Sequence, residues 1–139
     1  MTPAQASRFC TQLNVRMNIN QFYEYCLAKP GVTEHFPFDK DTLVFKVGGK
    51  MFALSSLSGW EHDRPGVNLK CDPDWAEELR AAFDGITPGF HMSKTHWNTV
   101  SINRDVPDTL VWELIDHSYK LVLLSLTKKL QNEIRQSAD

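Results

Sequence analysis

The stretch "DTLVFKVGGKMFALSSL", residues 41–57, constrains the fold more than any other part of the chain. In its first half, residues 43–47, large apolar side chains recur at every second position, which is the period of a β-strand. A second apolar run follows at residues 51–54. Gly48 and Gly49 stand between the two runs and can adopt the positive φ angles of a tight type I′ turn. The stretch therefore predicts a β-hairpin.

Helical patterns lie on both sides of this hairpin. The stretch "NINQFYEYCLAKPG", residues 18–31, predicts a helix that an asparagine caps, Asn18 or Asn20, and that a Pro-Gly pair ends. The stretch "DPDWAEELRAAF", residues 72–83, predicts another helix with Asp72 as its N-cap. Its expected buried face consists of side chains spaced by four residues: Trp75, Leu79 and Phe83.

Three shorter strands and a long helix complete the pattern. One strand is expected in "VNLKC", residues 67–71, after the polar loop "SGWEHDRPG". The stretch "ITPGFHMSKTHWNTVSINR", residues 86–104, predicts a strand, a short loop and another strand. From Pro107 to Leu130 apolar residues recur at helical spacing, which predicts one long amphipathic helix.

Hairpins flanked by helices predict an α+β fold with an antiparallel sheet, in the order α-β-β-β-α-β-β-α. We expect a single compact domain over residues 18–130. Residues 1–17 show no clear period and are expected to form a flexible or weakly docked extension. Residues 131–139 are expected to form a polar C-terminal tail.

The composition is that of an ordinary globular domain. The chain has 139 residues, 42% hydrophobic and 23% charged, with a formal net charge of −2. This charge gives no general attraction to nucleic acid, so a nucleic-acid site must come from a local patch. No apolar run approaches the roughly 20 residues that span a bilayer, and the N-terminus lacks a continuous hydrophobic segment. We therefore expect a cytoplasmic protein with no membrane partner, whose three cysteines are free thiols.

Five blocks of sequence occur in the order and spacing of a known family: "KPGVTEHFPFD", "TLVFKVGGKMFAL", "NLKCDPDWAEELR", "ITPGFHMSKTHWNTV" and "VPDTLVWELIDHSY". In these blocks, which lie within residues 18–125, the chain resembles the MmcQ/YjbR-like family of small bacterial proteins. Two departures stand out. Ser93 replaces the asparagine of the family pattern H-x-N-K-x-H-W, and the first 17 residues have no counterpart in the pattern.

The resemblance implies a fold and a function. The implied fold is a compact α+β domain with an antiparallel sheet, related in shape to frataxin and to secretion chaperones. The implied function is DNA binding through a "double wing" motif, which is the description that such proteins commonly carry.

The histidines and cysteines predict neither a metal site nor an active site. His91 and His96 are five residues apart, so they share no helical face and point to opposite sides of a strand. Cys26 is expected to be a small buried hydrophobe. Cys71 precedes a helix N-terminus that could lower its thiol pKa, but we favour a structural role for it. Because no nucleophile elbow, P-loop or HExxH motif occurs, we expect a non-enzymatic protein with no metal and no cofactor.

Two segments that contain lysine and no acid indicate a nucleic-acid surface. Lys46 and Lys50 belong to the first hairpin, and Lys94 and Arg104 belong to the second. If both hairpins project from one face, they form two basic wings whose lysines hold phosphates while Trp97 stacks on a base. The predicted DNA contacts are Lys46, Lys50, Lys94, His96, Trp97 and Arg104. With so few charges, binding is expected to be weak and strongly salt-dependent.

Two alternatives stay open from the residues alone. Lysines at hairpin tips are also ordinary solubilising charges, and a tryptophan among alternating residues is favoured for the core over a stacking platform. The other candidate function is a protein- or peptide-binding module, whose contact surface would include Trp60, Phe90 and Trp97. Exposure or burial of these rings decides between the two classes.

Overall fold

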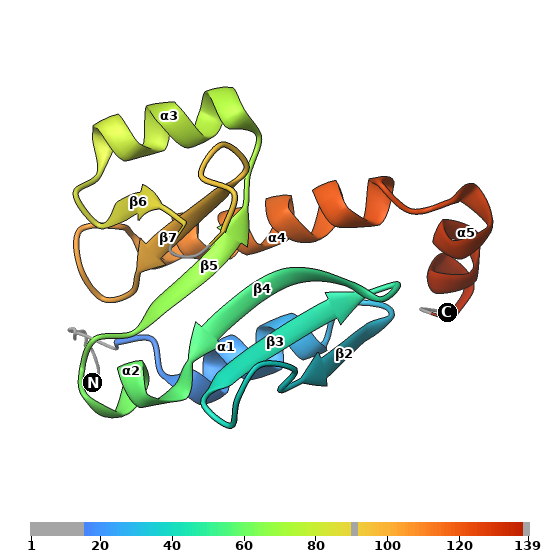
Figure 1. Cartoon of the computed structure of the whole chain (residues 1–139), viewed down its shortest axis with the longest axis horizontal. Coiled ribbons are helices and arrows are strands. Elements are labelled where there is room, and N and C mark those ends of the chain that lie inside the picture. Colours follow the sequence, from blue (N-terminus) through green and yellow to red (C-terminus); the bar gives the residue numbers. More distant parts are fainter. Residues whose placement is uncertain (1–15, 90–91, 138–139) are drawn as a thin grey trace, which may run out of the picture.

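The structure is a computed structural model that describes residues 16–89 and 92–137. It consists of one twisted sheet whose strands run side by side, with helices gathered on one of its faces (Figure 1). The predicted α+β class with an antiparallel sheet is confirmed.

The sheet has six strands in the order β2-β3-β4-β5-β7-β6, and every neighbouring pair is antiparallel. In chain order the strands are β2 (Val32–His35), β3 (Thr42–Val47), β4 (Lys50–Ser56), β5 (Gly66–Lys70), β6 (Ile86–Pro88) and β7 (Trp97–Ser101). Neighbours along the chain pair directly, except that β5 pairs with β7 and leaves the short β6 at the edge. The sheet is therefore built from hairpins and one displaced edge strand.

The predicted hairpin is β3 and β4. Gly48 and Gly49 have φ angles of 59° and 82°, as the two-residue turn requires. Phe45 pairs with Ala53 and the next residue of β3 pairs with Met51, so Phe52 is an extra residue in β4. This bulge lets Phe52 and Ala53 both face the helices.

The helices are α1 (Ile19–Leu27), α2 (Leu57–Glu61), α3 (Pro73–Ala82), α4 (Asp108–Leu124) and α5 (Lys128–Ser137). Of the two predicted caps of α1, Asn18 is the one used: its side chain accepts from the Gln21 N–H, and the Gln21 side chain accepts in return from the Asn18 N–H, both at 2.9 Å. Asp72 caps α3 as predicted, accepting from the Trp75 N–H at 3.3 Å.

The core lies between the sheet and α4, which packs across β3, β4 and β5, while α1 packs beside β2 and α3 beside β6. Ser118 of α4 is fully buried in this layer. Its hydroxyl donates to the Phe52 carbonyl at 2.6 Å and accepts the Lys70 N–H at 2.9 Å. One hydroxyl thus satisfies a backbone group on each of two neighbouring strands.

Two elements were not predicted. The strand β2 has the sequence VTEH, which lacks the alternating large apolar side chains that predict a strand. It lies at the edge of the sheet, and none of its residues is fully buried. The helix α2 occupies the predicted polar loop and has only five residues. Ser56 caps it by accepting from the Gly59 N–H at 3.4 Å. A helix of five residues is too short for its sequence pattern to be distinguished from that of a turn.

The prediction of one helix from Pro107 to Leu130 is wrong, and residues 131–137 of the expected polar tail belong to a second helix. The long helix α4 ends at Leu124, and the chain turns into α5. Gln131 is buried, and its side-chain amide donates to the Leu126 carbonyl at 2.8 Å and to the Leu124 carbonyl at 3.4 Å. The Leu124 carbonyl is a group that the end of α4 leaves open. The polar side chains of α5 conceal this contact in the sequence. Residues 138–139 lie outside the described residues.

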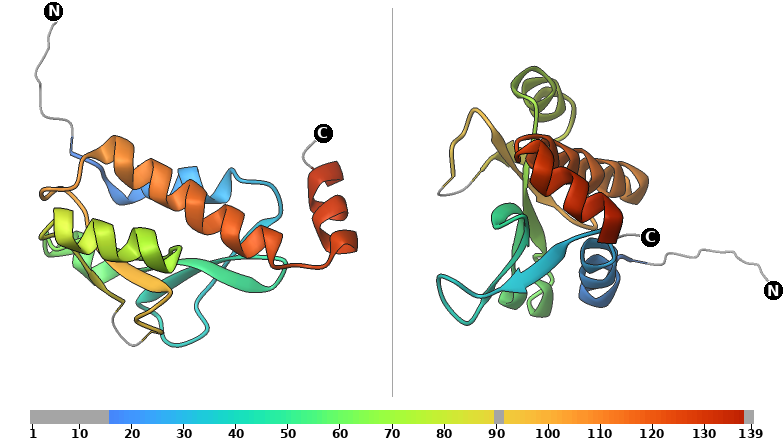
Figure 2. Two further views of the ribbon diagram at one scale, coloured as in Figure 1. Left: turned by 90° about the horizontal axis from the view of Figure 1, so that it is seen from above. Right: turned by 90° about the vertical axis from the view of Figure 1, so that its right-hand side faces the viewer.

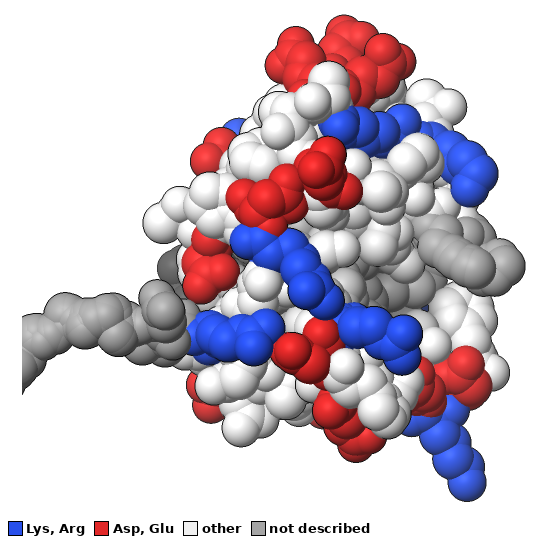
Figure 3. All heavy atoms as spheres, turned by 90° about the vertical axis from the view of Figure 1, so that its left-hand side faces the viewer, with Lys and Arg blue, Asp and Glu red and all other residues white. Residues whose placement is uncertain are grey.

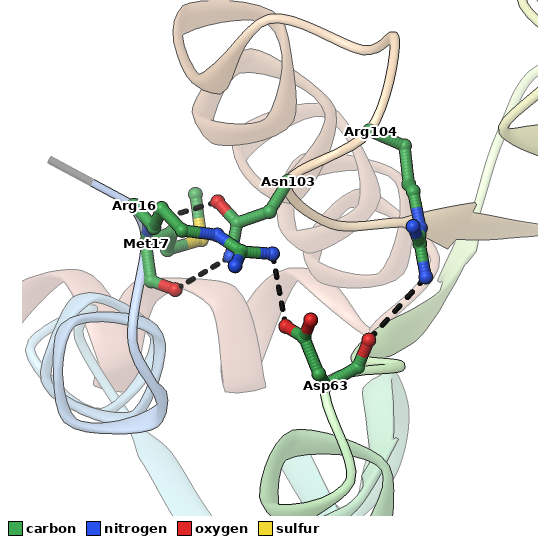
Figure 4. Close-up of polar contacts among 5 residues, drawn as sticks. All are labelled: Arg16, Met17, Asp63, Asn103 and Arg104. Carbon is green, nitrogen blue, oxygen red and sulfur yellow. Dashed lines mark hydrogen bonds and ion pairs between the residues drawn. The ribbon is translucent and has the colours of Figure 1, made fainter. Parts of the chain in front are cut away.

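The predicted extension of residues 1–17 lies outside the described residues except at its end. There the prediction is wrong, because Met17 is 3% exposed and belongs to the core. The Asn103 side chain accepts the Met17 N–H and donates to the Met17 carbonyl, each at 2.9 Å (Figure 4). Asn103 has a φ of 62°, a conformation that asparagine tolerates well.

None of the helices within residues 16–89 and 92–137 has the length and apolar character needed to cross a membrane.

The Ser118 bridge yields a stability prediction. Ser118→Ala leaves the Phe52 carbonyl and the Lys70 N–H buried without a partner, so we expect the free energy of unfolding to fall by about 1–3 kcal/mol. Urea denaturation monitored by circular dichroism measures it. The control is Ser125→Ala, on an exposed serine at the end of α4, with an expected change within about 0.5 kcal/mol. Equal effects of the two changes would contradict a special role for the bridge.

A second prediction concerns pH. The Nε2 atom of His117 accepts the Asp72 N–H at 3.1 Å, and burial lowers the pKa of this imidazole below its ordinary value of 6.5. The folded protein therefore binds this proton less readily than the unfolded chain does. The stabilisation is fully present above pH 6.5 and is lost as the pH falls through the lower folded pKa. In urea titrations between pH 7.5 and 5, His117→Asn should reduce the slope of stability against pH; an unchanged slope would contradict this role.

Candidate functional site

One face of the sheet is not covered by any helix that the structure describes. In the two views of Figure 2, α1 and α4 lie on one side of the sheet, whereas the β2–β3 loop and residues 92–96 before β7 extend from the other side. The side chains of β5 show the division: Val67 and Leu69 are in the main core, whereas Asn68 borders a surface groove. We call the helix-free side the open face.

A groove of about 530 Å³ lies on the open face. Its apolar side chains are Phe38, Leu54 and Met92. The remaining lining residues are polar or glycine: Asp39, Thr42, Ser55, Ser56, Arg64, Gly66, Asn68 and Thr99. Its volume is within the range of about 300–1,000 Å³ that is usual for small-ligand sites.

The floor of the groove is a polar strip across β4, β5 and β7. Asn68 and Thr99 are directly opposite each other in the register, and the Thr99 hydroxyl donates to Asn68 Oδ1. Because Oδ1 is used in this way, Asn68 can offer its Nδ2 hydrogens to a ligand atom that accepts hydrogen bonds.

Two carboxylates hold the loop that forms one wall. Asp39 Oδ1 accepts the N–H groups of Asp41 and Thr42 at 2.9 and 2.7 Å, which lowers the pKa of Asp39. Asp41 accepts from the Ser56 hydroxyl at 2.5 Å and from the Ser58 N–H at 2.8 Å, and the Ser56 bond is the largest cause of its lowered pKa. Both acids are therefore ionised and committed to positioning residues 36–41.

Two exposed side chains border the groove and are available to a ligand. Phe38 is 64% exposed, although burial is the usual place for a ring of this size. The Arg64 side chain is also exposed, and within residues 16–89 and 92–137 its guanidinium has no hydrogen-bond or ion-pair partner. The groove thus combines an aromatic ring, a cation and an amide.

Trp97, one of the predicted contacts, is 9% exposed. It forms a small cluster with Val44 and Leu54 on the open face, against which Met51 and Met92 pack. The alternative in which Trp97 belongs to a core is therefore the one observed, and its ring is not available as a stacking platform. The prediction that it stacks on a base is corrected for this reason.

The lysines of the first hairpin are not on a projecting wing. Lys46 is half-buried on the open face, opposite Met51 in the register. Lys50 is exposed beside the turn, and a Cβ atom on Gly48 would lie 2.5 Å from Leu126 Cδ1, so this turn packs against the end of α4. The hairpin runs within the sheet, and the loop that projects beside the β6–β7 connection is instead residues 36–41 (Figure 2).

Lys94 and His96 belong to the connection that leads into β7, and both are exposed. Their backbones hold this connection in place, because the Lys94 carbonyl accepts from the Arg80 side chain and the His96 carbonyl accepts the Cys71 N–H at 2.8 Å. Both residues lie at the β7 end that carries Trp97, which is the end where Lys70 pairs with Trp97.

Arg104 lies at the opposite end of the sheet from these residues, beyond the end of β7. Its guanidinium donates to the Asp63 carbonyl at 3.3 Å, and Arg16 forms an ion pair with the Asp63 carboxylate at 2.9 Å (Figure 4). The face drawn in Figure 3 shows basic side chains interleaved with acidic ones, without a continuous basic surface. The structure therefore does not bring Arg104 together with the other predicted contacts.

No set of three or more His, Cys, Asp or Glu side chains in the described part of the chain could hold a metal ion. The structural role favoured for Cys71 over a reactive thiol agrees with its surroundings, because burial raises the pKa of this thiol to about 11. Burial also raises the pKa of Cys26 far above its ordinary value. Both cysteines are buried and free, as predicted for structural residues.

Two of the rings expected on a protein-binding surface, Trp60 and Trp97, are largely packed inside the protein. Trp60 is half-buried, stacks on Phe22 at 5.7 Å between ring centroids, and donates to the Ser55 hydroxyl at 2.8 Å. Phe90 lies outside the described residues. The exposed rings are instead Phe36, at 46%, and Phe38.

Sequence reasoning missed four residues of the open face: Phe38, Arg64, Asn68 and Lys70. Strand alternation places Asn68 and Lys70 on one face, but only the packing of the helices in the folded protein shows which face they leave open. Phe38 and Arg64 are in loops, where no period predicts exposure.

Comparisons with known proteins agree with this architecture. Residues 27–121 match the model of the YjbR family. The chain is 35% identical to the uncharacterized protein YjbR of Escherichia coli (strain K12) over 104 residues, 75% of this chain and 86% of that protein. It is 38% identical to the uncharacterized protein YbdF of Escherichia coli O157:H7 over 110 residues, 78% of this chain and 87% of that protein.

Two crystal structures are similar to the chain. The Deinococcus radiodurans protein DR2400, with family-model domain DUF419, superimposes with a TM-score of 0.78 and 39% identity, covering 85% of this chain and 88% of that one. A Pseudomonas syringae protein superimposes with a TM-score of 0.64 and 27% identity, covering 76% of this chain and 99% of that one.

The placement of Trp97 yields a prediction. Trp97→Ala removes the largest side chain of the cluster that Trp97 forms with Val44 and Leu54 on the open face. We therefore expect the free energy of unfolding to fall by about 3–5 kcal/mol. His96→Ala, on the exposed neighbouring residue, should change it by less than about 0.5 kcal/mol. Thermal and urea denaturation of both variants check this. A Trp97→Ala protein as stable as His96→Ala would show that the ring is not part of a core.

Proposed function

This chain belongs to the YjbR family, and from that premise we propose that it binds nucleic acid through the open face of its sheet. The observation that carries the proposal is the presence of unpaired basic side chains on this face, beside a groove. Phosphate contacts supply most of the affinity of a protein for nucleic acid, so free cations on an accessible face are the first requirement.

The charge distribution supports this surface. Lys46 and Lys70 extend from β3 and β5 on the open face, on either side of β4. The ion pairs within the described residues are Arg16–Asp63 and Lys29–Asp116, so neither lysine is neutralised by a partner there. The exposed Lys94 stands near the Trp97 end of the same face. A net charge of −2 does not prevent binding to such a local patch.

The acids of the open face limit where phosphates can lie. Asp39 and Asp41 are ionised and belong to the wall formed by residues 36–41. A phosphate beside this wall would be repelled, whereas Lys46 and Lys70 lie toward the other end of the strands. We therefore propose that the phosphates avoid Asp39 and Asp41 and lie chiefly at the lysine end, while Arg64 is the cation available at the other end of the groove. The contacts are few and strongly dependent on salt.

We propose a binding role without catalysis. The hydroxyl of Ser56 lines the groove, but it donates to Asp41, a carboxylate that also holds the α2 N-terminus through the Ser58 N–H. Neither a histidine nor a cysteine borders the groove in the described part of the chain, and the lowered pKa of Asp41 makes its carboxylate a weak base for activating Ser56.

A peptide partner is the second candidate function, and one observation favours it. Phe36 and Phe38 are 46% and 64% exposed in the same loop, beside an apolar patch that includes Leu54 and Met92. Exposed rings next to a groove are typical anchors for protein recognition. The free lysines favour nucleic acid over this alternative, because an apolar peptide has no need of them.

The proposal is tested with Lys46→Ala/Lys70→Ala. We expect weaker binding of a labelled oligonucleotide and a salt dependence, d log K/d log [salt], that is less steep by about 1.4–1.8, because two phosphate contacts are lost. Fluorescence anisotropy between 20 and 200 mM salt, roughly the range where such contacts dominate, measures this. The matched control is Lys128→Ala/Lys129→Ala in α5, which removes the same charge away from the open face. Equal loss in both double variants would refute the assigned surface.

A further inference from the structure

We propose that the ligand of the open face is single-stranded nucleic acid, and that one unpaired base enters the groove and stacks on Phe38. This inference rests on the proposed function and specifies its ligand. Four features of the groove carry it: its walls, the Phe38 ring, the Asn68 amide and the positions of the cations.

The walls select against a duplex. The loop of residues 36–41 and residues 92–96 rise on the same side of the sheet (Figure 2). Phe38 and Asp39 of the first and Met92 of the second line the groove. In a duplex the hydrogen-bonding edges and faces of the bases are occupied by pairing and stacking. Only an unpaired base can present both its face and its edge to side chains at the bottom of a groove.

Phe38 supplies the stacking surface. It borders the groove and is 64% exposed, while its loop is fixed by the bonds that Asp39 accepts from the N–H groups of Asp41 and Thr42. A ring on a loop that is already ordered loses little entropy when a base stacks on it. Aromatic stacking of this kind tolerates any base, because every base has an aromatic face.

Asn68 supplies the edge contact. Its Oδ1 accepts from Thr99, and no acceptor for its Nδ2 hydrogens occurs within residues 16–89 and 92–137. These hydrogens suit a carbonyl oxygen or a ring nitrogen of a base. The other polar lining groups are neutral hydroxyls, apart from Asp39 and Arg64. Such a floor matches an uncharged heteroaromatic base better than it matches an anion.

The cations lie on both sides of Asn68 along β5. Lys70 is two residues beyond Asn68 on the same face, about 7 Å along the strand. Arg64 precedes β5 at the other end and borders the groove with a free guanidinium. A strand that crosses the groove with one base inserted would therefore meet a cation before and after that base.

The experiment compares two phenylalanines of one loop. Labelled oligothymidylate and a duplex of the same length are titrated by fluorescence anisotropy at low salt with the wild type, Phe38→Ala and the control Phe36→Ala. We expect the wild type to prefer the single strand. Phe38→Ala should weaken single-strand binding about tenfold, and Phe36→Ala, which lies outside the groove lining, less than about twofold. Phe38→Trp should retain the affinity.

The outcomes separate the two proposals. The inserted-base proposal is overturned if the wild type binds single strand and duplex equally and if Phe38→Ala and Phe36→Ala have the same affinity. The basic open face then remains the proposed binding surface. Absence of binding to either oligonucleotide at low salt overturns both proposals and favours a peptide as the occupant of the groove. Because Phe38 is largely exposed, its variants should keep the wild-type melting temperature, which excludes unfolding as the cause of a lost affinity.

Discussion

The packing of α4 against one face of the sheet is the interaction on which the rest of the structure depends. Its buried side chains cover β3, β4 and β5, and the Ser118 hydroxyl ties it to the backbone of two strands. The bulge at Phe52 turns two successive side chains of β4 toward this helix. The buried side chains of α1 and α3 belong to the same core as those of α4. The described helices therefore bury their apolar residues against one face of the sheet and leave the other face uncovered (Figure 1).

A sheet face without helices must still protect its apolar residues from water. Here Trp97 covers Val44 and Leu54 and forms a small second cluster that supports the floor of the groove. Two carboxylates hold the wall beside it by accepting backbone N–H groups, so the loop keeps its shape without apolar packing. The open face is therefore ordered before any ligand binds, and its exposed Phe38 ring, Arg64 and Asn68 stand on a rigid base.

The balance of charge is local. The chain as a whole is slightly acidic, and the end of the molecule shown in Figure 3 interleaves both signs. Two ion pairs join separate segments of the chain. Arg16 holds the start of the described chain to Asp63, and Lys29, just after α1, pairs with Asp116 of α4 while lying over the Tyr25 and Tyr119 rings. Within residues 16–89 and 92–137, Lys46 and Lys70 of the open face form no such ion pair, which supports the proposal that they bind phosphates.

The sequence by itself determined the local structure: the glycine hairpin, the Asn18 and Asp72 caps, the apolar stripe of α4 and the α+β class all follow from periods and caps that act over a few residues. Only the tertiary structure decided which face each side chain meets. Alternation puts Trp97 and Lys46 on one side of their strands, but the burial of Trp97 and the partial exposure of Lys46 depend on strands far apart in the chain. The groove, the polar β2 and the buried Gln131 of α5 arise in the same way, because long-range packing leaves no local signal.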